Sequence, residues 1–260
     1  MKYHSLIISA GLVITSVMST AAYAFSIPQP ATEVAASKLA HIELKATHGD
    51  QEAQFLLGLM YLSGRFVEQD QQLGIKWVSL AAEQGHVKAQ QTLADLSFEG
   101  NIVARDLTVA EHWYLALSEQ GSKWAEFRLG FIYAAGGEGV QRNCGKAVER
   151  FSAVGDVVSL GNVAWILATC PEAKYRNGEK ALKLARSLVE GDKEDPTNLD
   201  NLAAAYAETG DFNSAILTQH KAIDALKLSE HVDRSDEFEH RLQIYEQNKP
   251  FRESVPLMNE

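Results

Sequence analysis

The feature that most constrains this chain is a period of 36 residues that runs through its first half. Apolar, small and helix-capping residues return in register in three consecutive units. A fixed period of about 20–50 residues is typical of a solenoid, in which each unit buries its apolar face against the next. The pattern therefore predicts stacked repeats. The glycines that mark the period are Gly49, Gly85, Gly121, Gly64, Gly100 and Gly136.

Each unit has the pattern of two antiparallel helices. In the first unit we expect one helix over about 51–62 and a second over about 71–83, each followed by a glycine that ends it. Asp70, Asp106 and Asn143 stand just before the second helix of successive units. A side chain at that position accepts the free backbone N–H groups of the first helical turn. The recurring residues therefore have structural roles.

The first unit carries Ala53, Leu57, Gly58, Tyr61 and Gly64 in the spacing A-x-x-x-L-G-x-x-Y-x-x-G. This spacing resembles the Sel1-like repeat, a family of αα superhelices that serve mainly as adaptors in protein complexes. The next two units match it with small departures, such as one extra residue near the end of the third unit's first helix. The resemblance implies a binding scaffold.

From Ser159 the period shortens towards about 34 residues, the length of a tetratricopeptide repeat. Residues 198–222 resemble that repeat, and the unit before them resembles it with a longer loop at 171–178. The usual aromatic residue of the second helix is missing, and Ala185 and Gln219 hold its place. We expect one continuous superhelix, because the two repeat types are structurally close.

These observations predict an all-α fold, an αα-superhelix (solenoid) of about five helix-turn-helix repeats with capping helices at both ends. The caps are expected at about 31–47 and 236–247, because a terminal repeat must present one face to water. The tail after Phe251 is expected to be loosely ordered. The ranges that we assign are 1–24 signal peptide, 25–49 linker and N-terminal capping helix, 50–158 three Sel1-like repeats, 159–228 two tetratricopeptide-like repeats, and 229–260 C-terminal capping helix and tail.

The first 24 residues have the pattern of a secretory signal peptide. Lys2 precedes an uncharged apolar run over 6–18 and a small-x-small site at 22–24. The alternative, a membrane anchor, needs about 20 apolar residues. We therefore expect an exported protein, periplasmic or secreted, with no membrane insertion after cleavage. The formal net charge of −10 argues against nucleic acid as a partner, since that requires clustered lysine and arginine.

Cys144 and Cys170 are the only cysteines. In the repeat register Cys144 starts the second helix of the third unit, and Cys170 ends the helix that follows. Because consecutive helices run antiparallel, these two ends should lie side by side. In an oxidising compartment this predicts a disulfide, which would contribute about 3 kcal/mol in the chain-entropy model. The alternative is a reactive thiol, which would need a nearby base.

A groove for a protein or peptide partner is expected on the inner face, along the first helix of each unit. Aromatic side chains there would suit a peptide with apolar anchors. The alternative is that these side chains simply pack between adjacent helices. The residues that we assign to the groove are Phe55, Phe98, Trp124, Phe127, Phe131 and Trp165.

No motif in the sequence predicts catalysis. The eight histidines show no metal-binding pattern, and the glycine-rich stretch 136–146 departs from a phosphate-binding loop. We expect no enzyme activity, no cofactor and no metal. The hypothesis is a non-catalytic interaction scaffold in the bacterial cell envelope. The alternatives are a secreted enzyme acting on β-lactam or cell-wall substrates, or a regulator of a cell-wall enzyme. Cysteine-rich relatives linked to β-lactams carry a cysteine pair in each repeat, which this chain lacks.

Overall fold

The computed structural model describes residues 31–137, 139–228 and 234–253, and the predicted signal peptide lies outside them. The described residues form twelve α-helices, one short 3-10 helix and a single isolated β-bridge. The α-helices are α1 (Ala31–Thr47), α2 (Gln51–Ser63), α3 (Gln71–Glu83), α4 (Val87–Glu99), α5 (Leu107–Glu119), α6 (Lys123–Ala135), α7 (Cys144–Val154), α8 (Val157–Thr169), α9 (Gly178–Gly191), α10 (Pro196–Glu208), α11 (Phe212–Lys227) and α12 (Ser235–Glu246). The 3-10 helix is η1 (Ala173–Tyr175).

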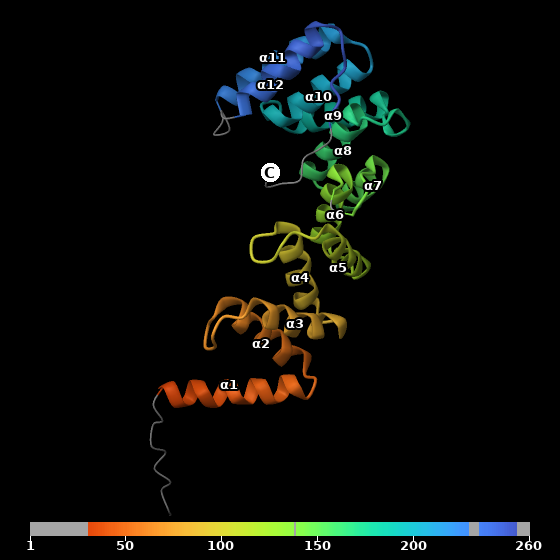
Figure 1. Ribbon diagram of the computed structural model, residues 1–260. Coiled ribbons are helices and arrows are strands. Elements are labelled where there is room, and N and C mark those ends of the chain that lie inside the picture. Colours follow the sequence, from red (N-terminus) through yellow and green to blue (C-terminus); the bar gives the residue numbers. More distant parts are fainter. Residues whose placement is uncertain (1–30, 138, 229–233, 254–260) are drawn as a thin grey trace, which may run out of the picture.

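The helices are stacked along one elongated axis, from α1 at one end to α11 and α12 at the other (Figure 1). In the part of the chain that is described, five packed helix pairs run from α2/α3 to α10/α11. At the ends, α1 packs mainly on α2 and α12 mainly on α11. The predicted all-α solenoid of five repeats with two capping helices is confirmed. The buried apolar residues form several clusters along the stack, as expected when each unit is buried by its neighbours.

The predicted capping residues define the helix starts. Asp70, Asp106 and Asn143 each accept the backbone N–H three residues later, at distances of 2.9–3.1 Å. Gly64 and Gly100 end α2 and α4 with φ angles of 67° and 71°, in the left-handed region that favours glycine. These local signals fix the helix bounds within a residue or two of those expected from the sequence.

His86 caps α4 at a position where the neighbouring units use Asp50 and Ser122. Its Nδ1 accepts the Ala89 N–H at 3.1 Å, so the proton is on Nε2, which donates to Glu52 at 2.9 Å. The imidazole thereby takes the place of a carboxylate or hydroxyl cap. His86 thus has a structural role.

Buried amides connect successive helix pairs. Gln54 and Gln90 occupy the same place in the first two units, and each donates to a backbone carbonyl of the preceding helix at 3.1 Å. Each also accepts from a second glutamine, Gln84 and Gln120 respectively, at 2.6 and 2.9 Å. In the third unit Glu126 stands at this place and forms an ion pair with α7 instead. The amide ladder satisfies polar groups that burial would otherwise penalise.

Gly58 sets the distance between α2 and α3. A Cβ atom there would lie 2.5 Å from Val78 Cγ2 and 2.9 Å from the Gly74 carbonyl oxygen. We therefore expect Gly58→Ala to lower the free energy of unfolding by about 1–3 kcal/mol, the usual effect of overpacking, as measured by urea denaturation. Gly191→Ala is the control, because a Cβ at this helical position meets nothing within 4 Å. Equal effects of the two substitutions would contradict this account.

The end of the described chain differs from the expectation of a loosely ordered tail. Residues 251–253 run back to the C-terminal end of α8, where the Glu253 N–H donates to the Thr169 carbonyl oxygen at 3.2 Å. The Phe251 ring lies 5.9 Å from the Trp165 ring, centroid to centroid. Aromatic burial and a paired backbone N–H hold this segment in place, and neither signal is visible in the local sequence.

Candidate functional site

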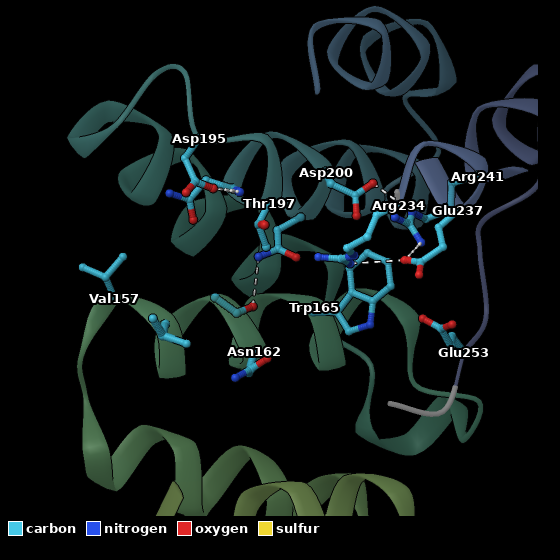
Figure 2. Close-up of a pocket in the computed structure, with 14 residues that line it drawn as sticks. Val157, Asn162, Trp165, Asp195, Thr197, Asp200, Arg234, Glu237, Arg241 and Glu253 are labelled. Carbon is cyan, nitrogen blue, oxygen red and sulfur yellow. Dashed lines mark hydrogen bonds and ion pairs between the residues drawn. The ribbon is translucent and has the colours of Figure 1, made fainter. Parts of the chain in front are cut away.

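A cavity of about 530 Å³ opens between α8, α10, the start of α12 and residues 251–253 (Figure 2). This volume is in the range of sites that bind small molecules or short peptide segments. One wall is apolar and aromatic, a second carries amides, and a third carries charged groups. The lining residues are Val157, Val158, Gly161, Asn162, Trp165, Asp195, Thr197, Asn198, Asp200, Asn201, Arg234, Glu237, Arg241 and Glu253.

The first wall is one face of α8. Val158, Asn162 and Trp165 recur at i, i+4 and i+7, the spacing of residues on one side of a helix. Val157 and Val158 are 62% and 64% exposed, so two apolar side chains stand in water at the edge of the cavity. The Asp156 carboxylate caps the helix by accepting a backbone N–H at 2.7 Å. This cap fixes where α8 starts and hence which side chains face the cavity.

The second wall belongs to α10, which runs beside α8. Asn201 Nδ2 donates to the Gly161 carbonyl oxygen at 3.2 Å. A Cβ atom on Gly161 would lie 3.3 Å from that nitrogen, so the glycine allows the two helices to approach. Asn198 and Asn201 are only 6% and 4% exposed. Buried amides of this kind need partners, and Asn201 finds one on α8.

A buried ion pair connects α10 to α12. Asp200 Oδ1 accepts from Arg241 Nε at 2.9 Å and from Gln219 Nε2 at 2.8 Å. Gln219 also donates to the Phe238 carbonyl oxygen at 3.1 Å. Burial raises the pKa of the Asp200 carboxyl above its ordinary value, and the Arg241 guanidinium opposes this shift. Three helices, α10, α11 and α12, are thus held together by one polar cluster.

The Arg241 guanidinium is surrounded by aromatic rings. Its Cζ lies 4.7 Å from the Phe238 centroid, 5.3 Å from that of Trp165 and 5.8 Å from that of Phe251. Such cation–π contacts are strongest when the cation is desolvated. Arg241 Nη2 is buried and has no hydrogen-bond partner among the described residues. The cavity is therefore bordered by a buried cation with unused donor capacity.

Two exposed charges at the edge of the cavity pair with one another. Arg234 forms an ion pair with Glu237 at 3.2 Å, drawn as a dashed line in Figure 2. Glu253 closes the cavity on the side of the returning segment, and burial raises the pKa of its carboxyl. The lining carries four carboxyl groups and two guanidinium groups, so its charges are only partly compensated, and the site is suited to bind a polar segment by several contacts.

Of the predicted groove residues, Phe55, Phe98 and Phe131 are buried, with 7%, 1% and 8% exposure. The expectation of an open groove is corrected for these three, because their rings fill the spaces between adjacent helices. Phe98, for example, packs edge-on against Tyr114 at 6.2 Å and lies under the Arg128 guanidinium. This is the packing alternative that the sequence left open.

The other three groove residues keep exposed surface but lie in two places. Trp124 on α6 is 43% exposed, and its ring stacks on Phe127 with centroids 6.1 Å apart. Trp124 also donates to Asp95 at 3.2 Å. Only Trp165 lines the cavity. The structure therefore separates an α6 aromatic pair from the Trp165 site.

The charged part of the site has only weak signals in the sequence. Nothing in the sequence distinguishes Asp200, Arg241 or Glu253, because a single charged residue in a helical repeat usually faces water. Two signals were present. Gln219 stands where a tetratricopeptide repeat has an aromatic residue, and the polar residues Asn198, Asp200 and Asn201 stand in the first half of a helix whose second half is mostly apolar. Both mark places where polar groups replace apolar packing.

The predicted disulfide between Cys144 and Cys170 is confirmed. It joins the first residue of α7 to the residue that follows α8. The Glu172 carboxylate lies 3.3 Å from Cys144 Sγ and 2.9 Å from Cys170 Sγ, and it also pairs with Arg142 at 3.0 Å. In the described ranges this is the only group of three potential metal ligands, and its two sulfurs are bonded to each other.

Comparisons with known proteins agree with this geometry. A model of the Sel1 repeat matches residues 51–86, 87–122 and 125–149. Among solved structures, a Sel1 repeat protein from Oxalobacter formigenes has a TM-score of 0.58 at 22% identity, over 76% of this chain and 58% of that chain. A protective antigen of uropathogenic Escherichia coli strains with an SLR fold has a TM-score of 0.51 at 25% identity, over 85% of this chain and 47% of that chain. No curated protein matches significantly.

This chain spans about half the length of those two solved chains. No helix in the described ranges is both long and apolar enough to cross a membrane. Sel1 repeat proteins generally mediate protein–protein interactions. The family model, the helix pairs and the similar structures agree on one identification: the chain contains three consecutive Sel1 repeats, in residues 51–149, within a longer helical-repeat solenoid.

Proposed function

We propose that this protein is a non-catalytic interaction scaffold of the bacterial cell envelope, periplasmic or secreted, which binds an extended protein segment at the α8/α10/α12 cavity. The observation that carries this is the combination of an accessible tryptophan, buried amides and a buried arginine in one cavity of about 530 Å³. Interface hot spots are enriched in tryptophan, tyrosine and arginine near a desolvated centre. Trp165 and Arg241 have that character here.

The location in the envelope is supported by the predicted signal peptide at 1–24 and by the Cys144–Cys170 disulfide, because disulfides persist in oxidising compartments. The non-catalytic role is supported by the pairing of the charged groups in the cavity. Arg241 is engaged by Asp200, and Arg234 by Glu237.

We expect Trp165→Ala to reduce partner capture from a periplasmic extract by about thirtyfold, the usual effect of losing a hot spot worth about 2 kcal/mol. The measurement is affinity capture after crosslinking, quantified by mass spectrometry. Trp124→Ala is the matched control, because Trp124 is a partly exposed tryptophan on α6 outside the cavity. Unchanged capture by a folded Trp165→Ala variant, or hydrolysis of β-lactam or peptidoglycan substrates by the purified protein, would contradict the proposal.

A further inference from the structure

The segment 251–253 completes the C-terminal end of α8. The last four carbonyls of a helix have no partner within the helix. In α8 the first two of these accept from the backbone N–H groups of Cys170 and Asn177. The last two accept from the segment: Ala168 from Arg252 Nη1 and Thr169 from the Glu253 N–H, both at 3.2 Å. The end of α8 therefore offers acceptors that an extended chain fills.

Two side chains of the segment contact residues on the same surface. Phe251 lies against the Trp165 ring at 5.9 Å, with the Arg241 guanidinium 5.8 Å from its centroid. Arg252 forms an ion pair with Glu208, the last residue of α10. Glu208 Oε1 also accepts from Arg176 Nε at 2.9 Å, which holds the carboxylate in place. The surface thus presents an aromatic contact, an acidic contact and two backbone acceptors.

We propose that residues 251–253 are a tethered ligand of this surface, and that the partner is an extended peptide carrying an aromatic residue followed by arginine, which replaces them. The inference rests on the proposed function and names the chemistry of its ligand. Trp165 recognises the aromatic side chain, Glu208 the arginine, and the Thr169 carbonyl the next backbone N–H. The segment borders the cavity through Glu253, so its release widens the cavity at the C-terminal end of α8.

The segment is held weakly enough to be exchanged. The contacts that hold it on α8 and α10 are few: two hydrogen bonds to carbonyls of α8, one ion pair with Glu208 and one ring contact with Trp165. A short tether supplies an effective concentration in the mM range. If the free segment bound with a Kd of about 0.1 mM, the tethered form would be seated about ten times out of eleven. A peptide of the same chemistry would then bind the intact chain about tenfold more weakly than a chain whose own segment is disabled.

The experiment uses a capped synthetic peptide, Asn-Lys-Pro-Phe-Arg-Glu-Ser, identical to residues 248–254, and isothermal titration calorimetry. We expect it to bind the full-length Phe251→Ala/Arg252→Ala variant about tenfold more tightly than the wild-type chain. A peptide with alanine in place of the phenylalanine and arginine should not bind. Lys249→Ala is the control variant, because the Lys249 ammonium donates to the nearby Gln247 side chain at 3.1 Å and not to the surface that holds residues 251–253. It should bind the peptide like the wild type.

Failure to bind the double variant, with the variant folded by circular dichroism, would overturn the inference. So would equal affinity for variant and wild type. Should the variant not fold, hydrogen exchange on the wild-type chain decides: saturating peptide should speed exchange of the Glu253 amide, and unchanged protection would refute displacement. The proposed function fails separately, if Trp165→Ala leaves partner capture intact. If Trp165→Ala loses partner capture but the peptide does not bind the double variant, only the tethered-ligand inference is overturned.

Discussion

Replacing Arg241 with alanine should lower the free energy of unfolding of the C-terminal part of the solenoid by about 3–5 kcal/mol. The substitution leaves Asp200, which is 4% exposed, with a buried negative charge and only the Gln219 amide as a partner. It also removes the cation between Trp165 and Phe238. The measurement is urea denaturation followed by circular dichroism and tryptophan fluorescence.

The loss should depend on pH. Burial raises the pKa of Asp200 in the folded state, and Arg241 opposes this. Without Arg241 the folded-state pKa rises further. A carboxyl group with a raised folded-state pKa binds protons more tightly when folded, so the folded form gains stability as the pH falls. The effect of Arg241→Ala should therefore be greatest at neutral pH and shrink towards the ordinary pKa of 3.8.

Arg234→Ala is the matched control for this prediction. Arg234 also lines the cavity and pairs with a carboxylate, but its side chain is 44% exposed. An exposed ion pair contributes about 0–1 kcal/mol, so this variant should remain near the wild-type stability. The double variant Asp200→Asn/Arg241→Met should lose less than Arg241→Ala, because it removes both buried charges. Equal losses of stability for Arg241→Ala and Arg234→Ala would show that the buried Asp200–Arg241 pair contributes no more than the exposed Arg234–Glu237 pair.

The sequence predicted the architecture well because the signals that build the helices are local. The capping residues Asp70, Asp106 and Asn143 act within one unit and return once in each unit, and Gly58 returns as Gly130 in the third unit. A single copy of such a pattern is weak, but repetition multiplies the evidence. The disulfide could be predicted for a related reason, since the register places Cys144 and Cys170 at adjacent helix ends.

The site could not be predicted equally well, because its contacts join residues far apart in the chain. Asp200 meets Arg241 across 41 positions, and Arg252 reaches Ala168 across 84. No periodicity relates these residues. The aromatic residues assigned to a groove differ in exposure for another reason. Phe98 and Trp165 both lie on the first helix of their units, but neighbouring side chains cover Phe98. Helical spacing predicts on which face of its helix a residue lies. It does not predict how much of that residue the next helix covers.

Reduction of the Cys144–Cys170 disulfide should lower the free energy of unfolding by about 3 kcal/mol, because the bond closes a loop of 26 residues and restricts the unfolded chain. The bond joins α7, in the third Sel1 repeat, to the end of α8, whose last carbonyls hold residues 251–253. Loss of the bond should therefore loosen the cavity half of the solenoid more than the first repeats. Urea denaturation with and without a phosphine reductant measures the change, and hydrogen exchange locates it.

The control is the Cys144→Ser/Cys170→Ser variant, which should show the reduced stability and no response to the reductant. In a solenoid each unit is stabilised by its neighbours, so a weakened join between α7 and α8 should let the two halves unfold separately. Two transitions are then expected in place of one, with exchange protection lost first in α8–α12 and retained in α2–α5. An unchanged midpoint after complete reduction, with two free thiols verified by mass spectrometry, would show that helix packing alone couples the halves.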